Sequence, residues 1–454
     1  MNQTKILATA LVALLAGGQA AHAAVSADEA AKLKSTLTPL GGEKAGNKDG
    51  NKDGSIPAWN GGITKPLPGK KLGVIPTQIF ADEKPVFQVT AKNAAQYADL
   101  LSDGTKALLA KYPDSFRLDV YPSHRTAAAP QEVYDNVFKN ATRCKTKDGG
   151  YSLEGCIGGT PFPIPKEGVE VMWNYLMRLE AESIEYRFKN IVGNADGSKT
   201  LATRNEIAFQ YPQYYKDATP ESWSGEYAMF RFNTLEPPFK AGESLVIRDS
   251  IDMKQSRQAW QYLVGQRRVR RAPTVSYDTP DFVASGANYF DEVQGFFGAL
   301  DRFQWKLIGK KELLIPYNNN GFIGAKLDDA IGKHHLNPDH VRWEKHRVWV
   351  VEATVAPGKR HAVPKRRYYL DEDTWLIALA DGFDAEGKLW RTTQVTPFVV
   401  PALPGTMMKT ATVFNLQANT MSVIQALNEE EFKIVPRKKE TYFTGDAVAA
   451  EAAR

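Results

Sequence analysis

The order of apolar and polar positions predicts helices in the first part of the chain and strands in the second. Up to residue 182, apolar residues recur at helical spacing, and the clearest case is Val171, Tyr175 and Leu179, which lie four residues apart. This spacing places the three side chains on one face of a helix. The predicted helices are 26–37, 91–111, 131–142 and 168–182.

From residue 183 onward, short apolar runs alternate with turn sequences. Asn194-Ala195-Asp196-Gly197 is typical of a hairpin turn, and Asp371-Glu372-Asp373 and 384–387 separate further runs. Short β-rich runs joined by tight turns indicate an antiparallel meander. We therefore expect an α+β fold, a large antiparallel sheet with helices packed on one face. The predicted strands are 183–192, 244–253, 259–263, 266–271, 346–355, 366–370, 375–383 and 388–395.

The first residues have the pattern of an export signal. Lys5 precedes an apolar run over 6–16, and Ala21-His22-Ala23 fits the small-x-small site of a signal peptidase. The run is shorter than the roughly 20 apolar residues that span a bilayer. No Cys near residue 23 offers a lipidation site. The sequence therefore predicts a cleaved signal peptide over 1–23 and a periplasmic protein that is not a lipoprotein.

The rest of the chain has the pattern of one domain. Its most apolar stretch, 395–414, is interrupted by three prolines and Lys409, which predicts extended edge structure and turns. No stretch has the composition of a flexible linker. We expect a single domain over 24–454, with an irregular N-terminal portion over about 24–165 and a β-rich portion over about 166–430.

Composition restricts the function only weakly. The formal net charge of +5 is small against 57 basic and 52 acidic residues, so no acidic partner is indicated and nucleic acid is not expected. Two cysteines, Cys144 and Cys156, flank the turn Asp148-Gly149-Gly150. In an exported protein this arrangement predicts a local disulfide. The alternatives are a free thiol and a metal pair.

The candidate chemical motifs are weak. Residues 49–54 match the opening of a calcium loop, but the twelfth place is Asn60, which has no carboxylate to bind Ca²⁺. A duplicated turn is the alternative. His334, His335 and His340 cluster around an Asn-Pro turn without a regular ligand spacing. We expect no metal site, no cofactor and no catalytic residue, although an enzyme stays open because triads are recognised by geometry.

Residues 267–271 form an arginine-rich run. On a strand, Arg268 and Arg270 face one side. They can bind acidic headgroups or an acidic partner through bidentate contacts. The alternative is an edge strand that its charges keep solvated.

Several longer phrases resemble one known family. The resemblance covers nearly the whole mature chain, and the family is DUF1329, a group of exported proteobacterial proteins. The sequence departs from the family pattern in one place, where the Asn-Lys-Asp-Gly unit at 47–50 is doubled. The phrases are Ser55-Ile56-Pro57-Ala58-Trp59, Tyr121-Pro122-Ser123-His124-Arg125, Gly158-Gly159-Thr160-Pro161-Phe162-Pro163, Arg257-Gln258-Ala259-Trp260-Gln261-Tyr262-Leu263, Pro316-Tyr317-Asn318-Asn319 and His346-Arg347-Val348-Trp349-Val350-Val351-Glu352-Ala353.

The resemblance implies a fold like that of the periplasmic lipoprotein carriers LolA and LolB, a curved antiparallel half-barrel with helices on its concave face. It implies a carrier or binding protein for lipids or other hydrophobic molecules, with RND-type exporters or outer-membrane proteins as partners. The alternative is an adaptor that docks such a transport complex and binds no small molecule. A lipid site needs a mostly apolar lining with a few polar groups. The residues that we expect to line it are Trp173, Trp260, Tyr262, Trp349, Arg268 and Arg270.

Overall fold

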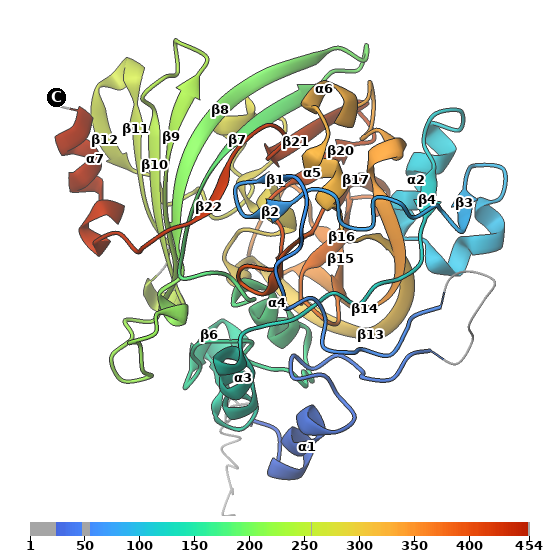
Figure 1. Ribbon diagram of the computed structural model, residues 1–454. Coiled ribbons are helices and arrows are strands. Elements are labelled where there is room, and N and C mark those ends of the chain that lie inside the picture. Colours follow the sequence, from blue (N-terminus) through green and yellow to red (C-terminus); the bar gives the residue numbers. More distant parts are fainter. Residues whose placement is uncertain (1–23, 48–54, 256, 453–454) are drawn as a thin grey trace, which may run out of the picture.

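The computed structural model describes residues 24–47, 55–255 and 257–452 (Figure 1). The predicted signal peptide at 1–23 and the calcium-loop candidate at 49–54 lie outside the described residues. Within the described residues, no helix is both long and apolar enough to cross a bilayer.

One open sheet of sixteen strands dominates the fold. Its neighbours pair antiparallel, except that β4 runs parallel to β14. β12 lies at one edge and β3 at the other, so the sheet curves without closing into a barrel. The predicted α+β class and curved antiparallel half-barrel are confirmed. The strands in their order across the sheet are β12 (Arg268–Arg271), β11 (Gln258–Leu263), β10 (Ser244–Ser250), β9 (Glu226–Glu236), β8 (Lys199–Gln210), β7 (Ser183–Gly193), β21 (Thr420–Ala426), β20 (Ala411–Asn415), β17 (Leu389–Val395), β16 (Ile377–Phe383), β15 (Lys365–Asp371), β14 (Arg342–Val355), β4 (Leu118–Val120) and β3 (Phe87–Val89), with β13 (Phe303–Pro316) on β14 and β22 (Phe432–Ile434) on β7.

Helices lie on both sides of this sheet. Figure 1 shows the strands curving around α4, while α7 and α2 lie outside the curve at opposite ends. α4 packs against β13 and β14, α7 against β10–β12, and α2 against β16 and β17. The longer helices are α2 (Asp103–Lys111), α3 (Gln131–Arg143), α4 (Gly168–Leu176) and α7 (Gly445–Ala452), and the short ones are α1 (Ala27–Ala31), α5 (Asn320–Gly324) and α6 (Leu327–Ala330).

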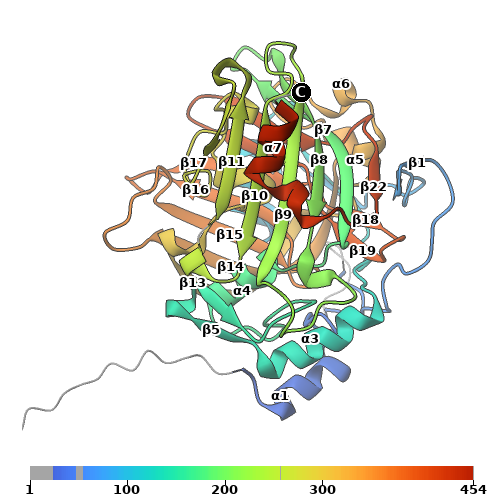
Figure 2. The ribbon, with the colours of Figure 1, turned by 90° about the vertical axis from the view of Figure 1, so that its left-hand side faces the viewer.

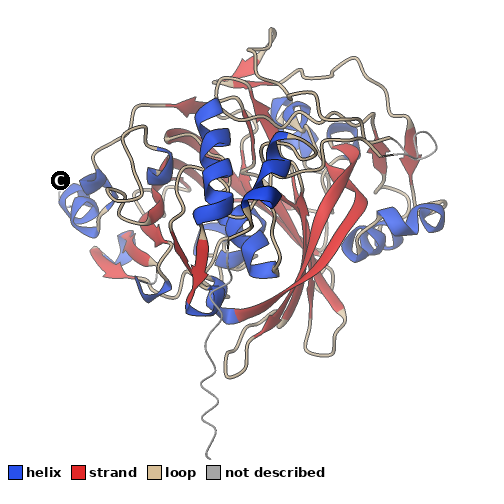
Figure 3. Ribbon diagram, turned by 90° about the horizontal axis from the view of Figure 1, so that it is seen from below, coloured by secondary structure: helices blue, strands red, loops and turns tan. Residues whose placement is uncertain are grey.

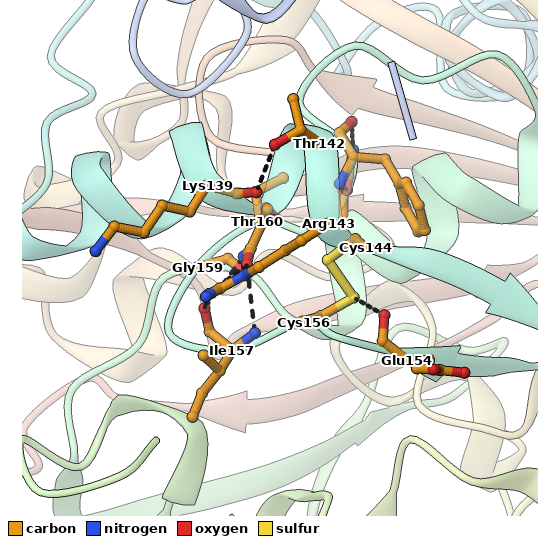
Figure 4. The surroundings of a disulfide bond; sticks show 12 residues. Lys139, Thr142, Arg143, Cys144, Glu154, Cys156, Ile157, Gly159 and Thr160 are labelled. Carbon is orange, nitrogen blue, oxygen red and sulfur yellow. Dashed lines mark hydrogen bonds between the residues drawn. A yellow bond between two sulfur atoms is a disulfide. The ribbon is translucent and has the colours of Figure 1, made fainter. Parts of the chain in front are cut away.

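α1 and α3 lie together beneath the sheet (Figures 2 and 3). Cys144, the residue that follows α3, forms a disulfide with Cys156, as predicted (Figure 4). The Asn140 side-chain amide donates to the carbonyl oxygens of Ile157 and Gly159 at 3.1 and 3.2 Å. The disulfide and these bonds fix the end of α3 to the loop after β6 (Ser152–Glu154). That small strand pairs with β5 (Lys145–Lys147).

The main hydrophobic cluster extends from Ile75 to Phe432, so the irregular N-terminal portion and the β-rich portion share one core. The helix expected over 91–111 is a 3₁₀ helix over Ala94–Leu100 followed by the separate α2, and the helix expected over 26–37 ends at Lys34. Two further differences have a structural reason. α4 ends at Leu176 rather than at residue 182, because the following residues turn to place Arg178 and Glu180 in a buried ion cluster. The prediction of edge structure over 395–414 is wrong at its end, since β20 begins at Ala411 and lies between β17 and β21. The two remaining pairs are β1 (Lys71–Leu72) with β2 (Ile75–Pro76) and β18 (Phe398–Val400) with β19 (Gly405–Met407).

Candidate functional site

The concave face of strands β7–β10 is lined by apolar side chains. Successive side chains of a strand point to opposite faces, so Phe230 and Phe232 point inward while Met229 points outward into the small cluster under α7. The rings of Phe209 and Phe230 stack with their centroids 4.7 Å apart. We call the space on this face the inner chamber. Its sheet wall is formed by Phe188, Ile207, Phe209, Phe230, Phe232, Leu245 and Ile247, with Ile424 from β21.

A long loop, residues 276–299, covers the inner chamber. Its ends are joined by a hydrogen bond from the Ala299 amide to the Ser276 carbonyl oxygen, at 3.4 Å. Its regular structure consists of the short 3₁₀ turns Phe282–Ala284 and Phe290–Gly295. We call this loop the lid. It directs into the chamber the side chains of Asp281, Val283, Phe290, Val293, Gln294 and Phe297.

The lid nearly fills the chamber. The remaining cavity has a volume of about 40 Å³, which is enough for a water molecule and too small for a lipid chain. A ligand larger than this therefore requires the lid to move away from the sheet.

Two buried ion pairs hold the lid closed. Asp291 accepts two hydrogen bonds from the Arg366 guanidinium, at 2.9 and 3.0 Å, and one from His361 at 2.8 Å. Glu292 accepts two from Arg391, at 2.5 and 2.8 Å. Burial raises the pKa of Asp291, but the Arg366 charge and the His361 hydrogen bond outweigh it and lower the pKa to about 2. The carboxylate is thus charged at neutral pH, and we call these pairs the latch.

One end of the chamber is polar. The Gln294 side chain donates to Gln425 at 2.9 Å and accepts from Arg178 at 2.8 Å. Arg178 also pairs with Glu180, which binds the fully buried Lys409 at 3.0 Å. Burial lowers the pKa of Lys409 to about 8, against the opposing charge of Glu180. The lid is therefore connected through Gln294 to a buried ion cluster.

Asp281 is the ionisable residue of the chamber lining. Its carboxylate accepts from the Val283 amide at 2.9 Å and from the Asn288 side chain at 3.1 Å. Burial raises its pKa to about 6, because these hydrogen bonds offset only part of the desolvation cost. A proton on this group therefore stabilises the closed lid.

The structure does not bring the six expected lining residues together. Trp173 lies in the core on α4, where its indole N–H donates to the Gly150 carbonyl oxygen at 2.8 Å. Trp260 and Tyr262 lie on the convex side, beneath α7. Trp349 packs beside Trp375 at 6.1 Å. None of these four is among the described side chains that line the chamber.

Arg268 and Arg270, the other two, are exposed on the edge strand β12. This is the position of a strand that its charges keep solvated, and a role in binding acidic groups stays a prediction.

The alternating Phe230 and Phe232 were a signal for the chamber in the sequence. The sequence held no such signal for the lid, because its apolar residues do not recur at the spacing of a helix or a strand.

The histidine cluster makes ordinary protein contacts. His335 lies 2.9 Å from the Ser115 hydroxyl and 2.7 Å, through its other ring nitrogen, from a carbonyl oxygen. His334 stacks on Tyr112 at 5.4 Å. Asp339 pairs with Arg117. Nδ1 of His334 is buried without a hydrogen-bond partner among the described residues.

Comparison with known proteins gives one family and one curated relative. The model of the family described as "Protein of unknown function (DUF1329)" matches residues 88–449. The uncharacterised protein PA3922 of Pseudomonas aeruginosa is 42% identical over 400 residues, which is 86% of each chain.

Three solved structures are similar at low identity. A candidate outer membrane lipoprotein-sorting protein domain from Vibrio parahaemolyticus has a TM-score of 0.43 at 12% identity, covering 60% of this chain and 94% of that one. A DUF1329 protein from Desulfovibrio piger has a TM-score of 0.40 at 12% identity, covering 59% and 92%. The LolA superfamily protein NE2245 from Nitrosomonas europaea has a TM-score of 0.37 at 11% identity, covering 62% and 100%.

Proposed function

The chain belongs to the DUF1329 family, and we propose that it is a periplasmic carrier for a lipid or another hydrophobic molecule, which binds in the inner chamber when the lid moves away. The observation that carries the proposal is the inner chamber itself. Eight apolar side chains of the sheet face a lid that is not part of the sheet. The lid contains only short 3₁₀ turns, so it can move without breaking the strand pairs of the sheet.

The apolar side chains that the lid buries determine how long the hydrocarbon chain of a ligand must be to replace them. Val283, Phe290, Val293 and Phe297 face the chamber, and exposing them costs roughly 6–12 kcal/mol, at about 1.5–3 kcal/mol for each side chain. An acyl chain gains about 0.8 kcal/mol for each buried methylene. A chain of roughly 8–15 methylenes therefore offsets the exposure of these four side chains, and breaking the latch adds to the cost that the ligand must offset.

The polar end of the chamber orients such a ligand. Gln294, Gln425 and Asn190 line it, and each has a side-chain amide NH₂ group that can donate to the oxygens of a carboxylate or ester. The hydrocarbon part then lies against Phe209 and Phe230. The predicted export signal supports a periplasmic location.

The small volume of the closed cavity favours one alternative, an adaptor that binds no small molecule. Beside the lid, Phe239 is 75% exposed on the β9–β10 loop, and the next residue, Lys240, donates to the Phe282 carbonyl oxygen of the lid at 3.2 Å. An exposed aromatic side chain at this position is suited to docking another protein. The adaptor would keep its lid closed.

A binding titration separates the two functions. The mature protein is titrated with a C16 fatty acid, with C6 as the short-chain comparison. The carrier binds C16 and not C6, and Phe232→Ala weakens C16 binding at least tenfold because its ring lines the chamber. Asn233→Ala, on the opposite face of the same strand, is the matched control and leaves binding unchanged. Equal effects of the two variants, or no C16 binding by the parent protein, would overturn the carrier.

A further inference from the structure

A second buried cluster lies away from the chamber, where β14 meets the turn after β15. It consists of His346 on β14, Asp371 at the end of β15, and Asp373 in the turn. One ligand atom from each residue lies within 4.8 Å of the others. The three side chains are at most 2% exposed. The register of the two strands, which pairs Val348 with Asp371, brings the histidine to the carboxylates.

The imidazole of His346 is held in one orientation. One ring nitrogen, Nε2, lies 2.9 Å from a carboxylate oxygen of Glu344, and the ring stacks on Tyr317 at 3.9 Å. Glu344 in turn accepts from the His124 amide at 2.8 Å. The other ring nitrogen, Nδ1, points to Asp371 Oδ1, at 3.9 Å, which is beyond hydrogen-bond distance. A carboxylate that binds the outer nitrogen of a histidine is typical of metal-ligating histidines.

Asp371 has one oxygen without a partner. Its Oδ2 accepts from the amide and the hydroxyl of Thr374, at 2.9 and 2.6 Å. Its Oδ1 is buried and accepts no hydrogen bond. Among the thirteen buried side-chain polar atoms of the described residues that have no hydrogen-bond partner, it is the one carboxylate oxygen, and a buried acceptor of this kind needs an explanation. The neighbouring carboxylates each have a guanidinium, in the pairs Glu344 with Arg342, Glu372 with Arg347 and Asp373 with Arg125.

We propose that His346, Asp371 and Asp373 bind a divalent transition-metal ion of the zinc class, through His346 Nδ1, Asp371 Oδ1 and a carboxylate oxygen of Asp373. Imidazole nitrogen and carboxylate oxygen are donor types that Zn²⁺ binds, at bond lengths of about 2.0–2.2 Å, and a water molecule completes four-coordination when the protein supplies three ligands. An ion at this place gives Asp371 Oδ1 its partner. Asp373 keeps its bonds to Arg125, because each carboxylate oxygen has a second lone pair.

The ion has a structural role. The cluster lies under the N-terminal loop, where Arg125 donates to the Glu43 carbonyl oxygen at 2.7 Å and Trp375 donates to that of Leu40 at 2.8 Å. The ion connects β14 to the turn after β15, and through Arg125 to this loop. It is bound during folding, because no ligand atom reaches the surface.

Metal analysis of the whole protein tests the site. The mature protein is purified without chelators, and is also unfolded and refolded in either zinc chloride or EDTA, with its disulfide intact. We expect about one equivalent of metal per chain and a higher melting temperature for the zinc-refolded sample. Asp371→Asn and His346→Gln should lower the metal content at least tenfold. The matched control is His335→Gln, which removes a buried imidazole elsewhere and should retain the metal.

Three results would overturn the proposal. The first is a metal content below a tenth of an equivalent per chain in both the purified and the zinc-refolded protein. The second is a metal content of Asp371→Asn equal to that of the parent protein. The third is a loss of metal in the His335→Gln control as large as in the cluster variants. If the two cluster variants do not fold, anomalous diffraction from zinc-loaded parent crystals decides the question. An ion beside His346 then supports the site, and an ion elsewhere overturns it.

Discussion

Removing the charge of Asp291 should open the lid and destabilise the protein. Asp291→Asn keeps the size of the side chain but leaves the Arg366 guanidinium buried without its counter-charge. It also weakens the contact with His361. The lid should then exchange its amide hydrogens faster over 276–299, and a C16 fatty acid should bind faster than it does to the parent protein.

The loss of unfolding free energy in Asp291→Asn can be calculated in two independent ways. The pKa of Asp291 is lowered to about 2, against an ordinary value near 3.9, which corresponds to roughly 2–3 kcal/mol of stability at neutral pH. Removing one partner of a buried pair costs about 3–5 kcal/mol. Because the folded-state pKa is depressed, this stability is present above about pH 4 and is lost as the pH falls toward 2. We therefore expect a loss of about 2–5 kcal/mol at pH 7.

Urea unfolding with hydrogen exchange measures both effects. A loss of this size should lower the urea midpoint by roughly 0.5–1 M, because the slope of the unfolding free energy against urea increases with protein size. Asp217→Asn is the control, because it breaks an exposed Asp–Arg pair with Arg437, and it should leave the midpoint unchanged. A midpoint for Asp291→Asn equal to that of the control, with unchanged exchange in the lid, would refute the reasoning.

Three further predictions concern the ion cluster, the disulfide and the pH response. Lys409→Met removes one of the two cations that pair with the buried Glu180, the other being Arg178, and should cost up to about 3–5 kcal/mol, measured by urea unfolding; a loss below about 1 kcal/mol contradicts this. Replacing Cys144 and Cys156 by Ser should cost about 2–3 kcal/mol for a loop of this length, and reduction of the parent protein should give the same loss; unequal losses count against it. The pKa of Asp281 is raised to about 6, so its stabilisation of the closed lid is present at low pH and is lost as the pH rises through about 6. Amide hydrogen exchange in the lid, corrected for the intrinsic exchange rate at each pH, should be faster at pH 7.5 than at pH 5. Asp281→Asn should remove this difference. If the difference remains in the variant, another group causes the pH dependence.

Local signals in the sequence were enough for part of the sheet, the family and the disulfide, while β8, β9, β13, β20 and β21 were not predicted. Alternation and turn residues located β7, β10, β11 and β14–β17 within a few residues. The two cysteines around Asp148-Gly149-Gly150 needed only a turn to bring them together. These features depend on residues that are close in the chain, and there periodicity and turn chemistry are informative.

The chamber and the metal cluster depend on contacts between distant residues. Alternation gives two faces to a strand but does not say which one is concave, so Trp260 and Tyr262 were expected inside and lie under α7. The lid has no regular spacing of apolar residues that would identify it in the sequence. His346 and Asp371 belong to different strands, and only the register of β14 on β15 makes them neighbours. The expectation of no metal site was made without that register.

The central claim is that the inner chamber binds a hydrophobic molecule, and native mass spectrometry of the mature protein purified from its own periplasm tests it most directly. The account predicts a bound lipid or other apolar molecule at close to one per chain, with a hydrocarbon part of roughly 8–15 methylenes or its equivalent. It also predicts that the ligand protects Phe209 and Phe230 from solvent when the lid is open. A protein of ligand-free mass that takes up no added lipid would contradict the account and favour an adaptor with a permanently closed lid.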